Sequence, residues 1–138
     1  MMVDQEVVKA RLMKLEEYIN DLKDYQNIKQ VEYEQNKLTK RFVERTLHLA
    51  IESCLDIGNH IISDERLGIV NSNVDIMKIL ADNDIIEKNV DTYIKMAKFR
   101  NVIVHDYANL DPEIIHQILT NNVEDLENFL LWIRDYIT

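Results

Sequence analysis

Apolar residues recur every three or four positions along three stretches of this 138-residue chain. That spacing gathers them on one face of an α-helix, where they can be buried against other helices. The three stripes are Val8, Leu12, Leu15, Ile19 and Leu22; Val43, Leu47, Ala50, Cys54, Ile57 and Ile61; and Leu119, Val123, Leu126, Leu130, Ile133 and Ile137. The pattern therefore predicts three long amphipathic helices.

The last of these helices has a clear start signal. Asp-Pro-Glu at residues 111–113 supplies an N-cap, a proline for the first helical position and an acid for the first turn. We expect one helix from this point to Ile137, with His116 at its surface. A shorter helix is expected over Val74–Ala81, after a connection that contains Gly68.

A fourth long helix is predicted from a stripe that ends in an unusual residue. The stripe consists of Ile86, Val90, Tyr93 and Ala97. Its register continues onto Arg100 and then Val104, so an arginine takes a position on the buried face. Because burying an unpaired charge costs on the order of several kcal/mol, Arg100 needs a carboxylate, a subunit boundary or an anionic ligand. Alternatively, the helix rotates or ends here and Arg100 extends into water.

Together the helices predict an all-α fold, an antiparallel bundle of four long helices plus a short one, in a single domain spanning residues 1–138. Two glycines and one proline are too few for a turn-rich β protein. No apolar run is long enough to span a membrane, and the N-terminus does not resemble a signal peptide. A single cysteine, Cys54, gives no internal disulfide and fits a reducing cytoplasm.

The charge of the chain restricts its partners. A formal net charge of −9 disfavours nonspecific binding to nucleic acid. Positive charge nevertheless gathers on residues 37–45 and 88–105, each with a local charge of +3. Taken alone, each segment is also consistent with a solvated helix face. The second segment leads into residues 100–107.

Residues 100–107, Arg-Asn-Val-Ile-Val-His-Asp-Tyr, place a guanidinium, an imidazole and a phenol within eight positions. A fixed cation beside a group that titrates near neutral pH suits chemistry on a phosphate. Five residues of an ideal helix turn through roughly 500°, so Arg100 and His105 would point about 140° apart. Two arrangements could bring them to one phosphate. The helix deforms before His105, or two copies of the chain face each other across a symmetric interface.

The spacing of Arg100, His105 and Tyr107 resembles the R-x4-H-x-Y signature of HepT-type HEPN toxins, and Asn101 fits the wider HEPN pattern. Residues 47–62 resemble the second-helix segment of that family. The helix order and the length also agree, so the resemblance covers essentially the whole chain.

This resemblance implies an all-α, HEPN-like homodimer that acts as a metal-independent ribonuclease toxin in the cytoplasm. Arg100 and His105 would be the catalytic pair, supported in RNA binding by Asn101 and Tyr107. Tyr107 would be the site at which a cognate minimal nucleotidyltransferase antitoxin transfers AMP, as in type VII toxin–antitoxin pairs. No cofactor and no metal ligand is implied. From the residues alone, Tyr107 is also typical of a packing tyrosine at a helix end.

The residue types suit RNA cleavage without a metal. The reaction needs a base for the 2′-hydroxyl, an acid for the departing 5′-oxygen and positive charge for the phosphorane. Two copies of the chain would supply two histidines for the proton transfers, which predicts 2′,3′-cyclic phosphate products. The alternative is a noncatalytic helical module that binds a nucleotidyltransferase partner or its nucleotide, which the acidic surface also suits.

A rival constellation lies on the second long helix, where His48, Glu52, Asp56 and His60 follow one another at four-residue steps. These residue types suggest metal ligands, but they extend over about 18 Å of one helix and cannot converge on one ion. We therefore expect them to form hydrogen bonds within the bundle, with Glu52 or Asp56 as the carboxylate partner of Arg100.

Overall fold

Helices make up the regular structure of this chain in the computed structural model, which describes all of residues 1–138. The long helices are α1 (Gln5–Lys23), α3 (Lys37–Glu65), α5 (Val90–His105) and α7 (Val123–Ile137). The shorter elements are α2 (Gln30–Gln35), α4 (Asn73–Asp82), the 3₁₀ turn η1 (Tyr107–Asn109) and α6 (Pro112–Asn121). The predicted all-α fold is confirmed. None of the helices combines the length and the apolar character needed to cross a membrane.

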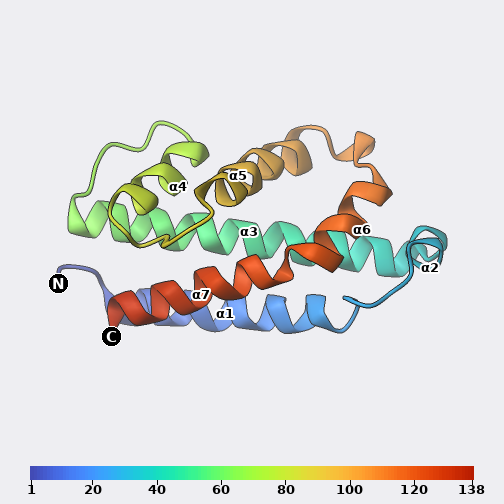
Figure 1. Ribbon diagram of the computed structural model, residues 1–138, viewed down its shortest axis with the longest axis horizontal. Helices are drawn as coiled ribbons and strands as arrows, with labels where there is room; N and C mark the ends of the chain where they lie inside the picture. The colour runs from blue at the N-terminus through green and yellow to red at the C-terminus, as the bar shows by residue number, and fades with distance from the viewer.

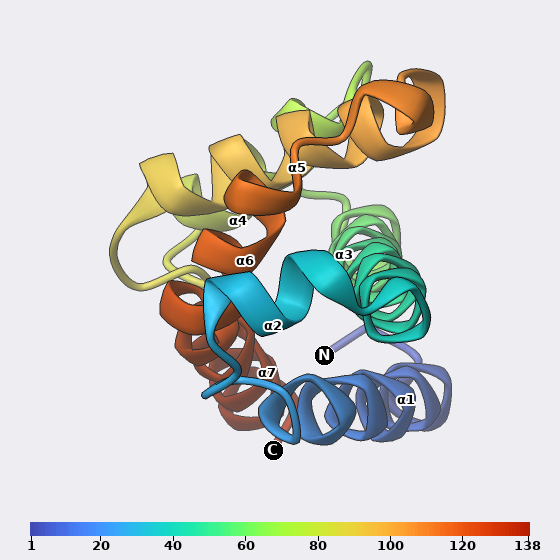
Figure 2. The same ribbon diagram turned by 90° about the vertical axis from the view of Figure 1, so that its right-hand side faces the viewer.

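The longest helix, α3, runs through the middle of the molecule (Figure 1). It packs against α1 and α7 on one side and against α4 and α5 on the other. Each long helix runs opposite to its neighbour, except that α3 and α7 run the same way. Seen from the end, α2 crosses the bundle and packs on α3 and α6 (Figure 2).

The core is one continuous cluster that contains the three stripes expected from the sequence. Cys54 lies in this cluster and is fully buried, as its place on the second stripe predicts. Gly58 allows α4 to approach α3 closely. A Cβ atom at that position would lie 2.6 Å from Cγ2 of Ile76 and 2.9 Å from Cδ1 of Leu80. A side chain there would force the Ile76 and Leu80 side chains to shift, since contacts this short are not tolerated in a packed core.

The last helix was predicted as one element, and that prediction is wrong because Asn122 divides it into α6 and α7. Its backbone leaves the helical conformation, with φ −117° and ψ 1°, and its side chain donates a 2.8 Å hydrogen bond to Asp125. The apolar stripe hides the break, because Leu119 and Val123 are both buried on either side of it. The expected start is confirmed, since Asp111 accepts a hydrogen bond from the backbone of Glu113 at 2.9 Å.

The fourth predicted helix, α5, differs from the prediction at both ends of its buried stripe. Ile86 is buried, but it lies in the connection before α5, and the helix starts only after Asn89, whose φ is 61°. At the other end, the buried face passes to Ile103, whereas Val104 is 41% exposed. The sequence did not predict α2, because its six residues bury only Tyr33 and are too few to show a stripe.

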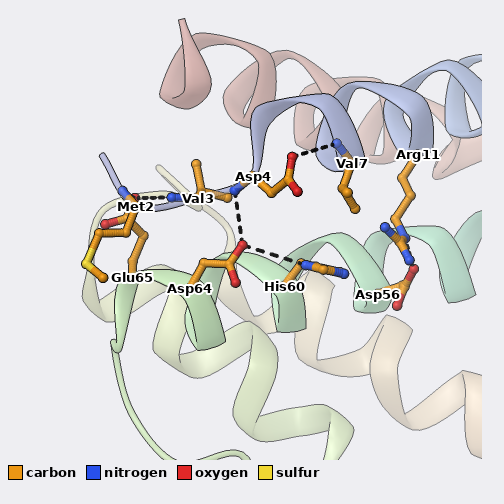
Figure 3. A network of polar contacts seen from close by, with 9 residues as sticks. All are labelled: Met2, Val3, Asp4, Val7, Arg11, Asp56, His60, Asp64 and Glu65. Atoms are coloured by element: carbon orange, nitrogen blue, oxygen red, sulfur yellow. Dashed lines mark hydrogen bonds and ion pairs between the residues drawn. The ribbon is translucent and has the colours of Figure 1, made fainter.

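The start of the chain is tied to the far end of α3 by a set of backbone contacts (Figure 3). The backbone N–H groups of Met2 and Val3 donate to the Glu65 carboxylate at 3.0 and 3.1 Å. The N–H of Asp4 donates to Asp64 at 3.1 Å. These contacts fix the entry into α1. The two ends of the chain lie at the same end of the bundle.

Candidate active site

Arg100 lies on α5 beside α3, where the carboxylate of Glu52 accepts a hydrogen bond from Nε. Nη1 donates to Oδ1 of Asn101 at 3.3 Å, and Nη2 makes no hydrogen bond within the chain. The Arg100 side chain is 26% exposed, so it is held in place yet remains accessible. Glu52 is therefore the carboxylate partner that the sequence required. The other candidate, Asp56, pairs with Arg11 of α1.

Asn101 is exposed on α5, and its side chain reaches α4. Its side-chain oxygen accepts hydrogen bonds from Nη1 of Arg100, at 3.3 Å, and from the amide of Asn73 on α4, at 3.4 Å. This places the oxygen where it supports the orientation of the guanidinium. Asn101 thus contacts the arginine, and its predicted role in supporting RNA binding stays a prediction.

His105 is the last residue of α5 and is exposed. No hydrogen bond or ion pair within the chain engages its imidazole. Because α5 is an uninterrupted α-helix through this residue, the helix does not deform before His105, and the first of the two predicted arrangements is wrong. No hydrogen bond or ion pair joins His105 to Arg100, whose side chain turns toward Glu52 on α3.

Tyr107 begins the turn η1 and points back to α3, where its hydroxyl donates a 2.9 Å hydrogen bond to Oε2 of Glu44. The residue is 54% exposed. This hydrogen bond is the main cause that raises the pKa of the phenol above its usual value; Arg41 acts in the opposite direction. Tyr107 is therefore a protonated phenol at neutral pH, reachable from solvent and fixed by one carboxylate.

Two adjacent hollows meet at Tyr107 and Glu44, and lysine, arginine and histidine side chains line them. Lys37, Lys40 and Arg41 line the first, and Arg41, Arg45 and His48 line the second. We call these five residues together the basic cleft. The positive segment 37–45 thus faces the end of the 100–107 motif, whereas the sequence also allowed a purely solvated helix face. Sequence reasoning missed Glu44, which is the one acid within that segment.

The rival residues on α3 form pairs along the bundle, as expected. Nε2 of His48 lies 3.4 Å from Oε1 of Glu52, and Nδ1 of His60 lies 3.7 Å from the Asp64 carboxylate (Figure 3). No group of three or more histidine, cysteine or acidic side chains is arranged to hold a metal ion.

His116 was predicted at the surface, and that prediction is wrong. The residue is half-buried, with Nε2 2.6 Å from the backbone oxygen of Ile28 and the ring centroid 5.8 Å from that of Tyr33. The cause is α2 and the loop before it, which cover the first turn of α6 and were not predicted. His116 therefore has a structural role in attaching this loop.

Several known proteins resemble this chain in sequence. The family model described as ribonuclease HepT-like matches residues 15–133. The mRNA nuclease HepT of Shewanella oneidensis is 38% identical over 85 residues, which cover 61% of this chain and 64% of that protein, slightly under two thirds of its length. The tRNA nuclease HepT of Aphanizomenon flos-aquae is 23% identical over 136 residues, which cover 98% of this chain and 92% of that protein.

A solved structure resembles the fold closely. It is the tri-AMPylated Shewanella oneidensis HEPN toxin in complex with an MNT antitoxin, with a TM-score of 0.83 and 28% sequence identity. The match covers 94% of this chain and 97% of that one. The likeness thus extends over nearly all of both chains.

Proposed function

Because this chain belongs to the HepT-like ribonuclease family, we propose that it is a ribonuclease toxin with Arg100 and His105 as its catalytic pair. One observation carries the proposal. Glu52 and Asn101 hold the Arg100 guanidinium, while Nη2 remains free and 26% of the side chain is exposed. An arginine oriented in advance binds phosphate oxygens with little further rearrangement, and so stabilises charge that grows in the transition state.

In this proposal, RNA is cleaved by its own 2′-hydroxyl without a metal ion. A histidine removes the proton from the 2′-hydroxyl, which attacks the adjacent phosphorus, and a second histidine protonates the departing 5′-oxygen. Arg100 binds the phosphate oxygens throughout. The products are a 2′,3′-cyclic phosphate and a free 5′-hydroxyl.

The two proton transfers require a second copy of the chain. Within one chain, His105 is exposed at the end of α5, and ideal helix geometry points it roughly 140° away from Arg100. A symmetric dimer that joins the ends of two α5 helices brings two arginines and two histidines to one phosphate, because such an interface presents the same patch twice. The homodimer is thus part of the catalytic unit.

Tyr107 is the proposed off switch. A nucleotidyltransferase encoded beside this chain transfers AMP to its hydroxyl, by analogy with the AMPylated HEPN toxin in complex with an MNT antitoxin. The 54% exposed ring is accessible to such a partner. The adduct adds negative charge and bulk next to the basic cleft. Both oppose the binding of the phosphate backbone of an RNA substrate.

The chemistry of the cleaved ends tests this proposal. RNA treated with the purified chain in the presence of EDTA should carry 2′,3′-cyclic phosphate and 5′-hydroxyl ends. Ends with 3′-hydroxyl and 5′-phosphate groups, produced only when Mg²⁺ is added, would contradict the mechanism.

The net charge of −9 favours a second candidate function. In it, the chain is a noncatalytic helical module that binds a nucleotidyltransferase or its nucleotide, because an acidic surface repels bulk RNA. Such a module binds its partner equally well when His105 is replaced, and it cleaves no RNA. The two functions therefore differ in the consequence of the same substitution.

A further inference from the structure

The hydroxyl of Tyr107 has one hydrogen-bond partner, and that partner is an acid. It donates to Oε2 of Glu44 at 2.9 Å, across 63 residues of sequence. Glu44 is half-buried on α3, whereas Tyr107 is 54% exposed. The phenol is therefore open to a reactant on one side and bonded to a carboxylate on the other.

The surroundings of this pair suit a chain of phosphates. The hollows on either side of Tyr107 are lined by the five residues of the basic cleft, all of them on α3. The other acid in the first hollow is Glu34 of α2, and the buried hydroxyl of Tyr33 lies near enough for its pKa to respond to the charges of Glu44 and Tyr107. Cations thus outnumber acids around the phenol.

A phenol needs a proton acceptor before it can attack phosphorus efficiently. The hydrogen bond to Glu44 raises the pKa of Tyr107, so the phenolate is scarce at neutral pH. An adjacent base removes this limit by taking the proton as the new bond forms. Glu44 is in hydrogen-bond contact with the hydroxyl and has the geometry that this role requires.

We propose that Glu44 is the base that accepts the Tyr107 proton when AMP is transferred to this residue, an inference that rests on the proposed function. The phenolic oxygen forms a bond to the α-phosphorus of a nucleoside triphosphate held by the nucleotidyltransferase. Its proton passes to Oε2 of Glu44. The bond between the α-phosphorus and the bridging oxygen breaks, and pyrophosphate leaves with that electron pair. The target chain thus contributes a catalytic group to its own modification.

The test measures the initial rate of AMP transfer from α-³²P-labelled ATP to the full-length chain by the nucleotidyltransferase encoded beside it, as a function of pH. Glu44→Gln keeps the shape of the side chain but cannot take a proton, and Glu44→Asp keeps a shorter carboxylate. Glu34→Gln is the matched control, because it removes an acid from the same hollow without touching the phenol. Tyr107→Phe removes the hydroxyl to which AMP is transferred.

We expect Glu44→Gln to be modified about 100-fold more slowly than the wild type at neutral pH. Its rate should rise with pH as the phenolate forms, whereas the wild-type rate reaches a plateau. Glu44→Asp should recover part of the rate, and Glu34→Gln should match the wild type.

Two kinds of result would overturn the inference. The first contradicts only the role of Glu44, and the second also contradicts the proposed modification site. A folded Glu44→Gln protein that is modified at the wild-type rate with the wild-type pH profile contradicts the role of Glu44 alone. A wild-type chain that takes up no label, or a Tyr107→Phe chain that takes up as much as the wild type, contradicts the proposed modification site and this inference with it. Circular dichroism of each variant confirms that the fold is intact.

Discussion

One carboxylate oxygen of Glu52, on α3, contacts both Arg100 and His48. Oε1 accepts the hydrogen bond from Nε of Arg100 and lies 3.4 Å from Nε2 of His48. Because His48 lines the basic cleft, this oxygen on α3 connects the proposed catalytic arginine to that cleft. The position of Arg100 thus depends on a residue that lies 48 positions earlier in the chain.

Glu52→Gln should reduce RNA cleavage more than it reduces stability. The pair is partly exposed, at 26% for Arg100 and 39% for Glu52, so its loss should lower the free energy of unfolding by about 1 kcal/mol or less. Cleavage should fall by about tenfold or more, because a catalytic group that loses its orientation loses much of its effect. Urea denaturation measures the stability, and initial rates measure the cleavage. Glu87→Gln, at an exposed residue, is the control.

Exchanging the two charges separates pairing from catalysis. Arg100→Glu alone places two acids side by side and should destabilise the fold, and adding Glu52→Arg should recover part of that loss. Cleavage should stay absent in the double variant, because the guanidinium now lies on α3. A double variant no more stable than Arg100→Glu would show that the two residues do not pair in solution.

Tyr33→Phe should leave stability unchanged or raise it. The Tyr33 hydroxyl is buried without a hydrogen-bond partner, and an unsatisfied buried polar group costs about 1–3 kcal/mol. The matched control is Tyr93→Phe, which removes a hydroxyl that donates to the backbone oxygen of Asp125 at 2.8 Å. That variant should lose about 1 kcal/mol. A larger loss for Tyr33→Phe than for Tyr93→Phe, by urea denaturation, would indicate that Tyr33 has a partner.

The stability of the fold should decline above pH 9. Burial raises the pKa of the Cys54 thiol from its usual 9.0 and those of the Tyr33 and Tyr93 phenols from 10.0. Above these usual values the unfolded chain loses protons that the folded chain retains, so the free energy of unfolding falls as the pH rises. In Cys54→Ala the decline should begin nearer pH 10.0. The test is the free energy of unfolding of the wild type and of Cys54→Ala, measured from pH 7 to 11. Identical pH profiles for the two proteins would contradict the prediction.

A heterodimer with one wild-type chain and one His105→Ala chain tests whether the site is shared. Purified by two different affinity tags, it should cleave RNA at far less than half the wild-type rate, because one histidine cannot serve as both base and acid. A heterodimer of wild-type and His60→Ala chains is the control, since His60 pairs with Asp64 away from the motif. Half of the wild-type rate would mean that each chain carries an independent site.

Periodicity predicted the parts of the fold in which a single helix face is buried. It located α1, α3 and α4, and it identified Arg100 as a charge that needs a partner. It failed at Asn122, because the stripe from Leu119 to Val123 stays in register across a break in the backbone. It also failed for α2, which is too short to bury more than Tyr33.

The contacts that assemble the site lie beyond local pattern. Tyr107 and Glu44 are 63 residues apart, and their hydrogen bond depends on how α5 and η1 pack along α3. The local charge of residues 37–45 was visible in the sequence, but only the fold shows that these residues face Tyr107. The sequence could name a carboxylate partner for Arg100 only as one of two acids.

The most direct measurement is RNA cleavage by the purified chain in the presence of EDTA. The wild type should cleave, and His105→Ala and Arg100→Ala should each be slower by about 100-fold or more. His60→Ala should cleave like the wild type. A folded His105→Ala protein that cleaves RNA at the wild-type rate, or a wild-type protein that is inactive until Mg²⁺ is added, would contradict the account.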